Sequence, residues 1–357
     1  MTSEEVHALL VSEGKGGILD PKTIQHNLFF ALFEYDGKQM CRAITNGKVE
    51  FFIADCWERN AVAIESLSSV VVFKGMLEAI FSIAAKIVDK GIFPSIGDVI
   101  TSQPRFDPRK SLLTKRELLI SLPPFDLEIN KPTWFESPER QTLFMFIANT
   151  LFRFVTMHEL GHLYHQHGKR SSLHGHYEFD ELGAEEPDGS ISAQAREIIA
   201  DSFAFQHLAE FQLRHLLSER NTPVGSLLAS HFMKSEDELL QFISQIIFIY
   251  FYMMESPNWA HREPAKWTHP PAQFRLQTIF ASLLEHGLVS VHKEMMPKVL
   301  ENALFLGPSI TSLMFDIFPE YNWMRVLDQP KYRAHYEDIL TEIPIWWKDD
   351  NRWESLD

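Results

Sequence analysis

Residues 137–168, SPERQTLFMFIANTLFRFVTMHELGHLYHQHG, decide the architecture of this chain. A serine followed by a proline is a typical helix start, because the serine side chain caps the first turn and proline suits the first helical position. After Pro138 no further proline or glycine occurs until Gly161. A long helix is therefore expected to begin here and to end near Gly168.

The second half of this helix contains an HExxH motif, HELGH at residues 158–162. Positions i and i+4 share one face of a helix, so His158 and His162 can bind one zinc ion together. Glu159 is then placed to take a proton from a zinc-bound water rather than to bind the metal. Sixteen histidines make a chance pair more common than usual, so a second signal is needed.

That signal lies on the next expected helix, from about Ser192 to Glu219, in the sequence REIIAD at residues 196–201. Glu197 and Asp201 share a face there. Such a pair is usually a solvated face, but the flanking residues are mostly apolar, and two carboxylates among them are costly to bury without a metal or a cation. Glu197 is predicted as the third zinc ligand and Asp201 as a carboxylate that orients a ligating imidazole.

HELGH followed on a later helix by ExxAD resembles the gluzincin clan of metallopeptidases, particularly its HtpX-like and CAAX-prenyl-protease-like branch, over roughly residues 138–285. Residues 268–271, THPP, with Arg275 are similar to a segment that follows ExxAD in those peptidases. The resemblance implies that His269 helps to stabilise an oxyanion, while Arg275 could pair with a buried carboxylate. An ordinary helix start explains the prolines equally well. Those relatives carry transmembrane helices, which this chain is not expected to have.

Other ligands for the metal stay open. A metzincin needs HExxHxxGxxH, but its glycine position is His165 and its third histidine position is Gly168. Nearby histidines could supply a different ligand or a second site, although such histidines more often face solvent; they are His165, His167, His174 and His176. The polar segment 169–190 is predicted to be an exposed acidic loop, and it offers alternative carboxylates, namely Glu178, Asp180, Glu181, Glu185, Glu186 and Asp188.

Composition restricts the functional classes. With 33 basic and 48 acidic residues, the net charge of −15 disfavours nucleic acid as a partner. Two cysteines cannot form a disulfide framework, and the start MTSEEVHALLVSEG lacks the features of a signal peptide, which predicts a cytoplasmic setting. The apolar runs 61–88 and 239–254 contain polar residues, so no membrane insertion is expected.

The expected fold is predominantly helical α+β, with a small N-terminal sheet, a two-helix zinc core and a helical C-terminal lobe. Turn signals at Asp36-Gly37 and Asn46-Gly47 predict a three-stranded meander over residues 28–53. A helix is expected from about Ala61 to Asp89. Residues 1–136 would form a sheet-containing lobe and residues 137–357 the peptidase core, possibly in one continuous domain.

These observations predict a zinc-dependent metalloendopeptidase with one zinc ion per chain and Glu159 as general base. Its substrate would be a protein or peptide, and a loose similarity to Lit-type phage-exclusion and ImmA-like regulatory peptidases implies one chosen intracellular protein. In gluzincins an edge strand binds the substrate, which implies a strand near residues 28–53 or Leu118–Leu122. The alternative is a catalytically silent, zinc-stabilised interaction scaffold, which would have no need of Glu159.

Overall fold

The predicted long helix is α6, Pro138–His165. Its start is confirmed, since the hydroxyl of Ser137 accepts a hydrogen bond from the backbone N–H of Arg140. It ends where Gln166 adopts the left-handed conformation with φ of 57°. In this computed structural model the described residues are 3–93, 106–123, 125, 131–167, 191–219, 235–255, 263–264, 267, 269–286 and 293–347.

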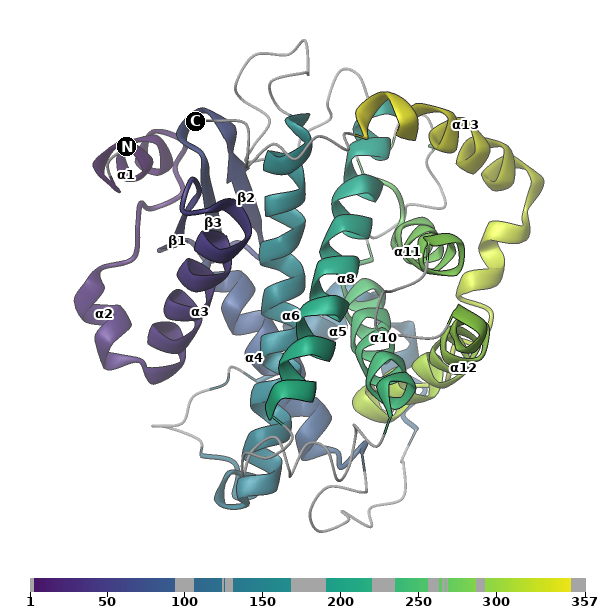
Figure 1. Cartoon of the computed structure of the whole chain (residues 1–357). Coiled ribbons are helices and arrows are strands. Elements are labelled where there is room, and N and C mark those ends of the chain that lie inside the picture. Colours follow the sequence, from purple (N-terminus) through teal and green to yellow (C-terminus); the bar gives the residue numbers. More distant parts are fainter. Residues whose placement is uncertain are drawn as a thin grey trace.

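The second predicted helix is α8, Ile191–Glu219. It packs along α6 in the middle of the molecule, as Figure 1 shows. Gly161 permits this approach, because a Cβ at that position would lie only 3.0 Å from Cα of Ala200. Thr150 on α6 accepts a hydrogen bond from Gln212 on α8 at 2.9 Å. Later residues of α6 thus face earlier residues of α8, and the helices run antiparallel.

The predicted meander over residues 28–53 is wrong for most of its length. Residues Leu28–Thr45 form a helix, α3, and only Glu50–Ala54 form a strand, β1. Asn27 caps α3, because its side-chain oxygen accepts hydrogen bonds from the N–H groups of Phe29 and Phe30.

The two presumed turn signals in this region have other roles. Gly37 lies inside α3 against the ring of Phe51, where a Cβ would come within 2.6 Å of a ring atom. Glycine is therefore required for close packing between α3 and β1. Asn46 takes a left-handed φ of 51° and ends α3 as its C-cap.

The helix predicted over residues 61–89 is wrong in its first part. Residues Ala61–Ile64 and Ser69–Phe73 are the strands β2 and β3, and the helix α4 covers only Lys74–Asp89. All residues of both strands are buried, so the alternation that identifies a half-exposed strand is missing. The β-branched run Val70–Val72 favours a strand.

The sheet has the strand order β1-β3-β2, with β1 parallel and β2 antiparallel to β3. It lies beside α6, with α3 in contact with β1. The second predicted edge strand, Leu118–Leu122, is also wrong, because Lys115–Ile120 form the helix α5 behind a capping box made by Thr114 and Glu117. The edge strand nearest to α6 is β2.

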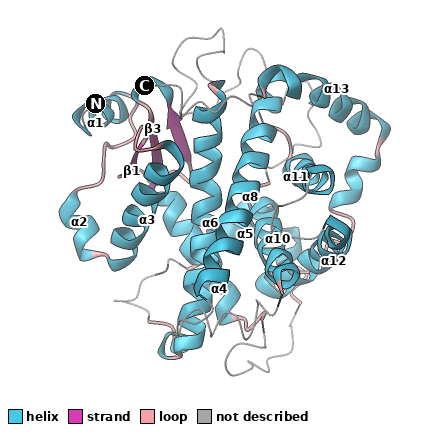
Figure 2. Cartoon of the chain, in the orientation of Figure 1, coloured by secondary structure: helices cyan, strands magenta, loops and turns pink. Residues whose placement is uncertain are grey.

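The C-terminal part is helical, as predicted, and Figure 2 shows magenta strands only near the N-terminus. Of the described residues, 73% are helical, and they include one small three-stranded sheet, which confirms a predominantly helical α+β fold. Among the described residues, none of the helices is long and apolar enough to cross a membrane. Short helices α1 (Ser3–Ser12) and α2 (Pro21–His26) precede α3, and the later helices are α10 (Glu236–Met253), α11 (Ala272–His286), α12 (Met296–Phe315) and α13 (Pro330–Trp346).

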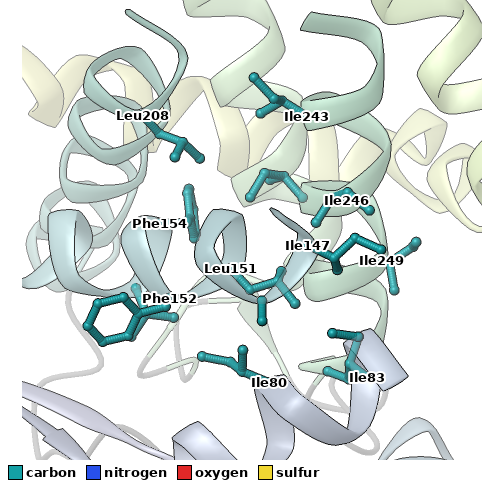
Figure 3. Close-up of a cluster of buried hydrophobic side chains, with 14 of the residues drawn as sticks. Ile80, Ile83, Ile147, Leu151, Phe152, Phe154, Leu208, Ile243, Ile246 and Ile249 are labelled. Atoms are coloured by element: carbon teal, nitrogen blue, oxygen red, sulfur yellow. The ribbon is translucent and has the colours of Figure 1, made fainter. Parts of the chain in front are cut away.

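A continuous hydrophobic core fixes the position of α6 between the sheet side and the C-terminal helices (Figure 3). Full burial of one large aliphatic side chain contributes about 1.5–3 kcal/mol, so this core holds α6 far more firmly than its own helix propensity does. The predicted division near residue 136 stays a prediction. Core side chains come from α4 (Ile80, Ile83), α6 (Ile147, Leu151, Phe154), α8 (Leu208) and α10 (Ile243, Ile246, Ile249).

Candidate metal centre

Three predicted side chains meet where α6 and α8 face each other. His158 and His162 lie one helical turn apart, and their Nε2 atoms are 3.1 Å from each other. Glu197 reaches them from α8, with Oε2 3.4 Å from Nε2 of His158 and Oε1 3.3 Å from Nε2 of His162. One donor atom from each residue lies within 4.8 Å of the other two, so the group can hold a metal ion.

The spacing and burial of these donors fit a metal ion. Donor atoms bound at about 2.0–2.1 Å around a tetrahedral ion are about 3.3 Å apart. The measured separations of 3.1, 3.4 and 3.3 Å are close to this value. Oε2 of Glu197 is buried and has no hydrogen-bond partner within the described part of the chain, although burying a carboxylate oxygen without a hydrogen bond is costly. A cation between the three residues would compensate that oxygen.

Asp201 and Arg275 form a buried support behind His158. Oδ1 of Asp201 is 2.9 Å from Nδ1 of His158, an ion-pair distance at which the carboxylate can orient the ring with Nε2 toward the other donors. Arg275, from α11, donates to both oxygens of Asp201, at 2.6 Å from Nε and 2.8 Å from Nη2. Its Nη2 also lies 3.6 Å from Oε2 of Glu197. The structure therefore brings His158, Asp201 and Arg275 together with Glu197.

The electrostatics of the group favour positive charge at its centre. Burial opposes ionisation of Glu197, but the surrounding histidines hold its pKa well below the ordinary value. Burial likewise opposes ionisation of Asp201, and Arg275 keeps the pKa of that carboxyl low. Burial favours the neutral form of His158, yet the nearby carboxylates of Asp201 and Glu197 raise its pKa well above the ordinary value. Two ionised carboxylates thus face the imidazoles.

The Asp201 support gives a prediction for metal affinity. Asp201→Asn removes the negative charge that orients His158, and such outer-shell changes weaken metal binding by about 10–100-fold. A competition titration with a chromophoric zinc chelator measures the change. Asp36→Asn is the matched control, because Asp36 forms a similar two-fold pair with Arg153 of α6 at 2.8 Å. Equal zinc affinity in the two variants would contradict the assigned support.

His162 has a second contact that was not predicted, through the ring nitrogen that points away from His158 and Glu197. Nδ1 of His162 is 2.8 Å from Nδ1 of His167. The expectation that the nearby histidines face solvent is wrong for His165 and His167, which are buried with 1% and 3% exposure. Burial and the neighbouring cationic groups hold the pKa of His167 well below its ordinary value. His174, His176 and the acidic segment 169–190 lie outside the described residues.

The two predicted catalytic residues, Glu159 and His269, belong to different parts of the chain and differ in their exposure. Glu159 follows His158 on α6 and is buried with 2% exposure. It is not one of the three donors. Nε2 of His269 is 4.0 Å from Oε2 of Glu197, and its side chain is 24% exposed, which is more than that of either HExxH histidine. Burial lowers the pKa of His269, against the opposing effect of Glu197.

Comparison with known proteins adds no relative. No protein-family model, curated protein or solved structure matches the chain. The resemblance to gluzincins therefore stays a prediction from the sequence motifs at residues 158–162 and 197–201 and from His269 and Arg275.

Proposed function

We propose that this chain is a zinc-dependent endopeptidase of the gluzincin type, which hydrolyses peptide bonds of a protein or peptide. The observation that carries the proposal is the three-donor group formed by His158, His162 and Glu197, in which a buried carboxylate oxygen accepts no hydrogen bond from the described residues. Two imidazoles and one glutamate are the ligand set of catalytic zinc sites that keep a further position for water.

Zinc held there supplies Lewis acidity toward a carbonyl oxygen and makes water more acidic. The chain provides the proton transfers. Glu159 follows the first ligand on α6 and is three residues before His162, so its carboxylate is the nearest base in the sequence to the donors. It accepts the proton of the attacking water and delivers it to the leaving amine. No side chain becomes acylated in this scheme.

His269 is suited to the charge that develops on the scissile carbonyl. It is the most exposed of the side chains around Glu197, and its lowered pKa favours an uncharged ring that can donate one N–H. A donor placed beside a forming oxyanion stabilises it more than it stabilises the substrate. The Asp201–Arg275 pair holds the first ligand in place while this happens.

Metal removal tests the proposal. Zinc-loaded protein is expected to create new peptide termini in a library of peptides derived from a proteome, read by mass spectrometry. A chelator should abolish these cleavages and added zinc should restore them. Cleavage that persists without metal, or its absence from the zinc-loaded protein across the library, would contradict the function.

We further propose that the substrate is a specific protein and that the protein acts in the cytoplasm. Cys41 and Cys56 are both free thiols, which suits a reducing compartment. The same mass-spectrometric assay on intact lysate proteins distinguishes the cases. Cleavage in a few proteins supports narrow specificity, and degradation of many counts against it.

A further inference from the structure

The two histidine ligands are supported by different chemical groups. His158 directs Nδ1 at the carboxylate of Asp201. His162 directs Nδ1 at another imidazole, that of His167, at 2.8 Å. Among the described residues, no carboxylate lies within ion-pair distance of Nδ1 of His162. The carboxylate that contacts His162 is Glu197, and it does so at Nε2. The partner of the second histidine is thus an imidazole rather than a carboxylate.

Metal binding through Nε2 of His162 would set the direction of this hydrogen bond. Nε2 of His162 faces the donors of His158 and Glu197, so it must carry a lone pair if it is to bind a metal. The proton of His162 is then on Nδ1, and its partner must accept it. Nδ1 of His167 is therefore the acceptor, and the proton of His167 is on Nε2. That Nε2 is buried and has no hydrogen-bond partner within the described ranges.

The structure holds the ring of His167 by packing. His167 follows the left-handed residue that ends α6, so the chain turns there. Its ring stacks on that of His165, with centroids 5.5 Å apart and an interplanar angle of 18°. Trp346, at the end of α13, approaches its edge at 6.3 Å. The guanidinium of Arg196 lies 4.7 Å from the centre of the Trp346 ring and ties this end of α13 to α8.

We propose that His167 is a positioning residue that fixes the tautomer and the ring orientation of His162. This inference rests on the proposed metal-dependent function and goes beyond the HExxH and ExxAD residues. His167 is not itself a member of the three-donor group, because its Nδ1 faces the side of His162 opposite to Nε2. Its contribution is to present Nε2 of His162 as a metal ligand.

Two substitutions separate hydrogen bonding from packing. His167→Asn keeps an acceptor near the position of Nδ1, whereas His167→Leu fills similar space without one. Zinc affinity, measured by chelator competition at constant pH, is expected to fall about 10–100-fold in His167→Leu and to stay within a few-fold of wild type in His167→Asn. His335→Leu is the control, since His335 is a buried histidine of α13 that hydrogen-bonds Gln194 at 2.9 Å and not a metal ligand.

The outcomes separate failure of the proposed role of His167 from failure of the proposed metal-dependent function. Wild-type protein that binds no zinc overturns both. Wild-type affinity in His167→Leu, or an equal loss in the Asn and Leu variants, overturns only the role of His167. If His167→Leu does not fold, nitrogen NMR of the zinc-loaded wild type decides: a proton on Nδ1 of His162 and on Nε2 of His167 supports the inference, and the reverse tautomers overturn it.

Discussion

Glu159→Gln is expected to lower peptide-bond cleavage by about 10²–10⁴-fold, the range that a positioned general base contributes. Glutamine has nearly the same shape as glutamate, but its amide cannot accept the proton of an attacking water at neutral pH. Zinc content should be unchanged, because Glu159 is outside the three-donor group. The measurement is the rate of terminus formation from the library peptide that the wild type cleaves best, alongside elemental analysis.

The control is Glu139→Gln in the first turn of the same helix, where Glu139 accepts a hydrogen bond from Ser137 at 2.7 Å. It should retain both activity and zinc. Full activity of Glu159→Gln would remove Glu159 from the mechanism. A variant that loses zinc would instead show that Glu159 supports the metal centre.

Glu197→Ala is expected to lower zinc content from about one ion per chain to near zero after dialysis, since only two of the three protein ligands of a catalytic zinc site remain. Glu197 is also the residue of α8 that contacts both His158 and His162. Elemental analysis of purified wild type and variant measures the effect, and peptide cleavage should be lost with the metal.

Glu210→Ala is the matched control for this change, because Glu210 is on the same helix and pairs with Arg214 at 3.4 Å rather than with the histidines. Full zinc content in Glu197→Ala would move the third ligand elsewhere. The histidines and carboxylates of residues 165–190 would then be the next residues to replace.

The centre of the fold was predictable because its signals are local. The serine and proline at 137–138 give the start of α6, and the uninterrupted run that follows gives its length. Spacing alone puts His158 and His162 on one face of a helix, and Glu197 and Asp201 on one face of another. Spacing alone does not predict the antiparallel docking of the two helices. That docking brings the carboxylate oxygens of Glu197 to 3.3–3.4 Å from the Nε2 atoms of His158 and His162.

Tertiary packing explains the wrong assignments at Gly37 and at the strands β2 and β3. Gly37 looks like a turn residue until Phe51 is seen against it. The strands β2 and β3 look helix-compatible because burial on both faces removes their alternation. The role of His167 depends on a ring from α13, far along the chain, and its only sequence signal is its position two residues after the end of α6.

The antiparallel docking of α6 and α8 also affects how the proposed metal would bind. The HExxH helix alone offers two ligands, and the third arrives only when α8 has folded against Gly161. An ion bound there would cross-link His162 on α6 to Glu197 on α8, and closing a chain segment of that length costs an unfolded chain about 3–4 kcal/mol in the chain-entropy model. We infer that tight binding of a metal at this site requires the helix pair to be assembled, so the proposed metal and the fold would stabilise each other.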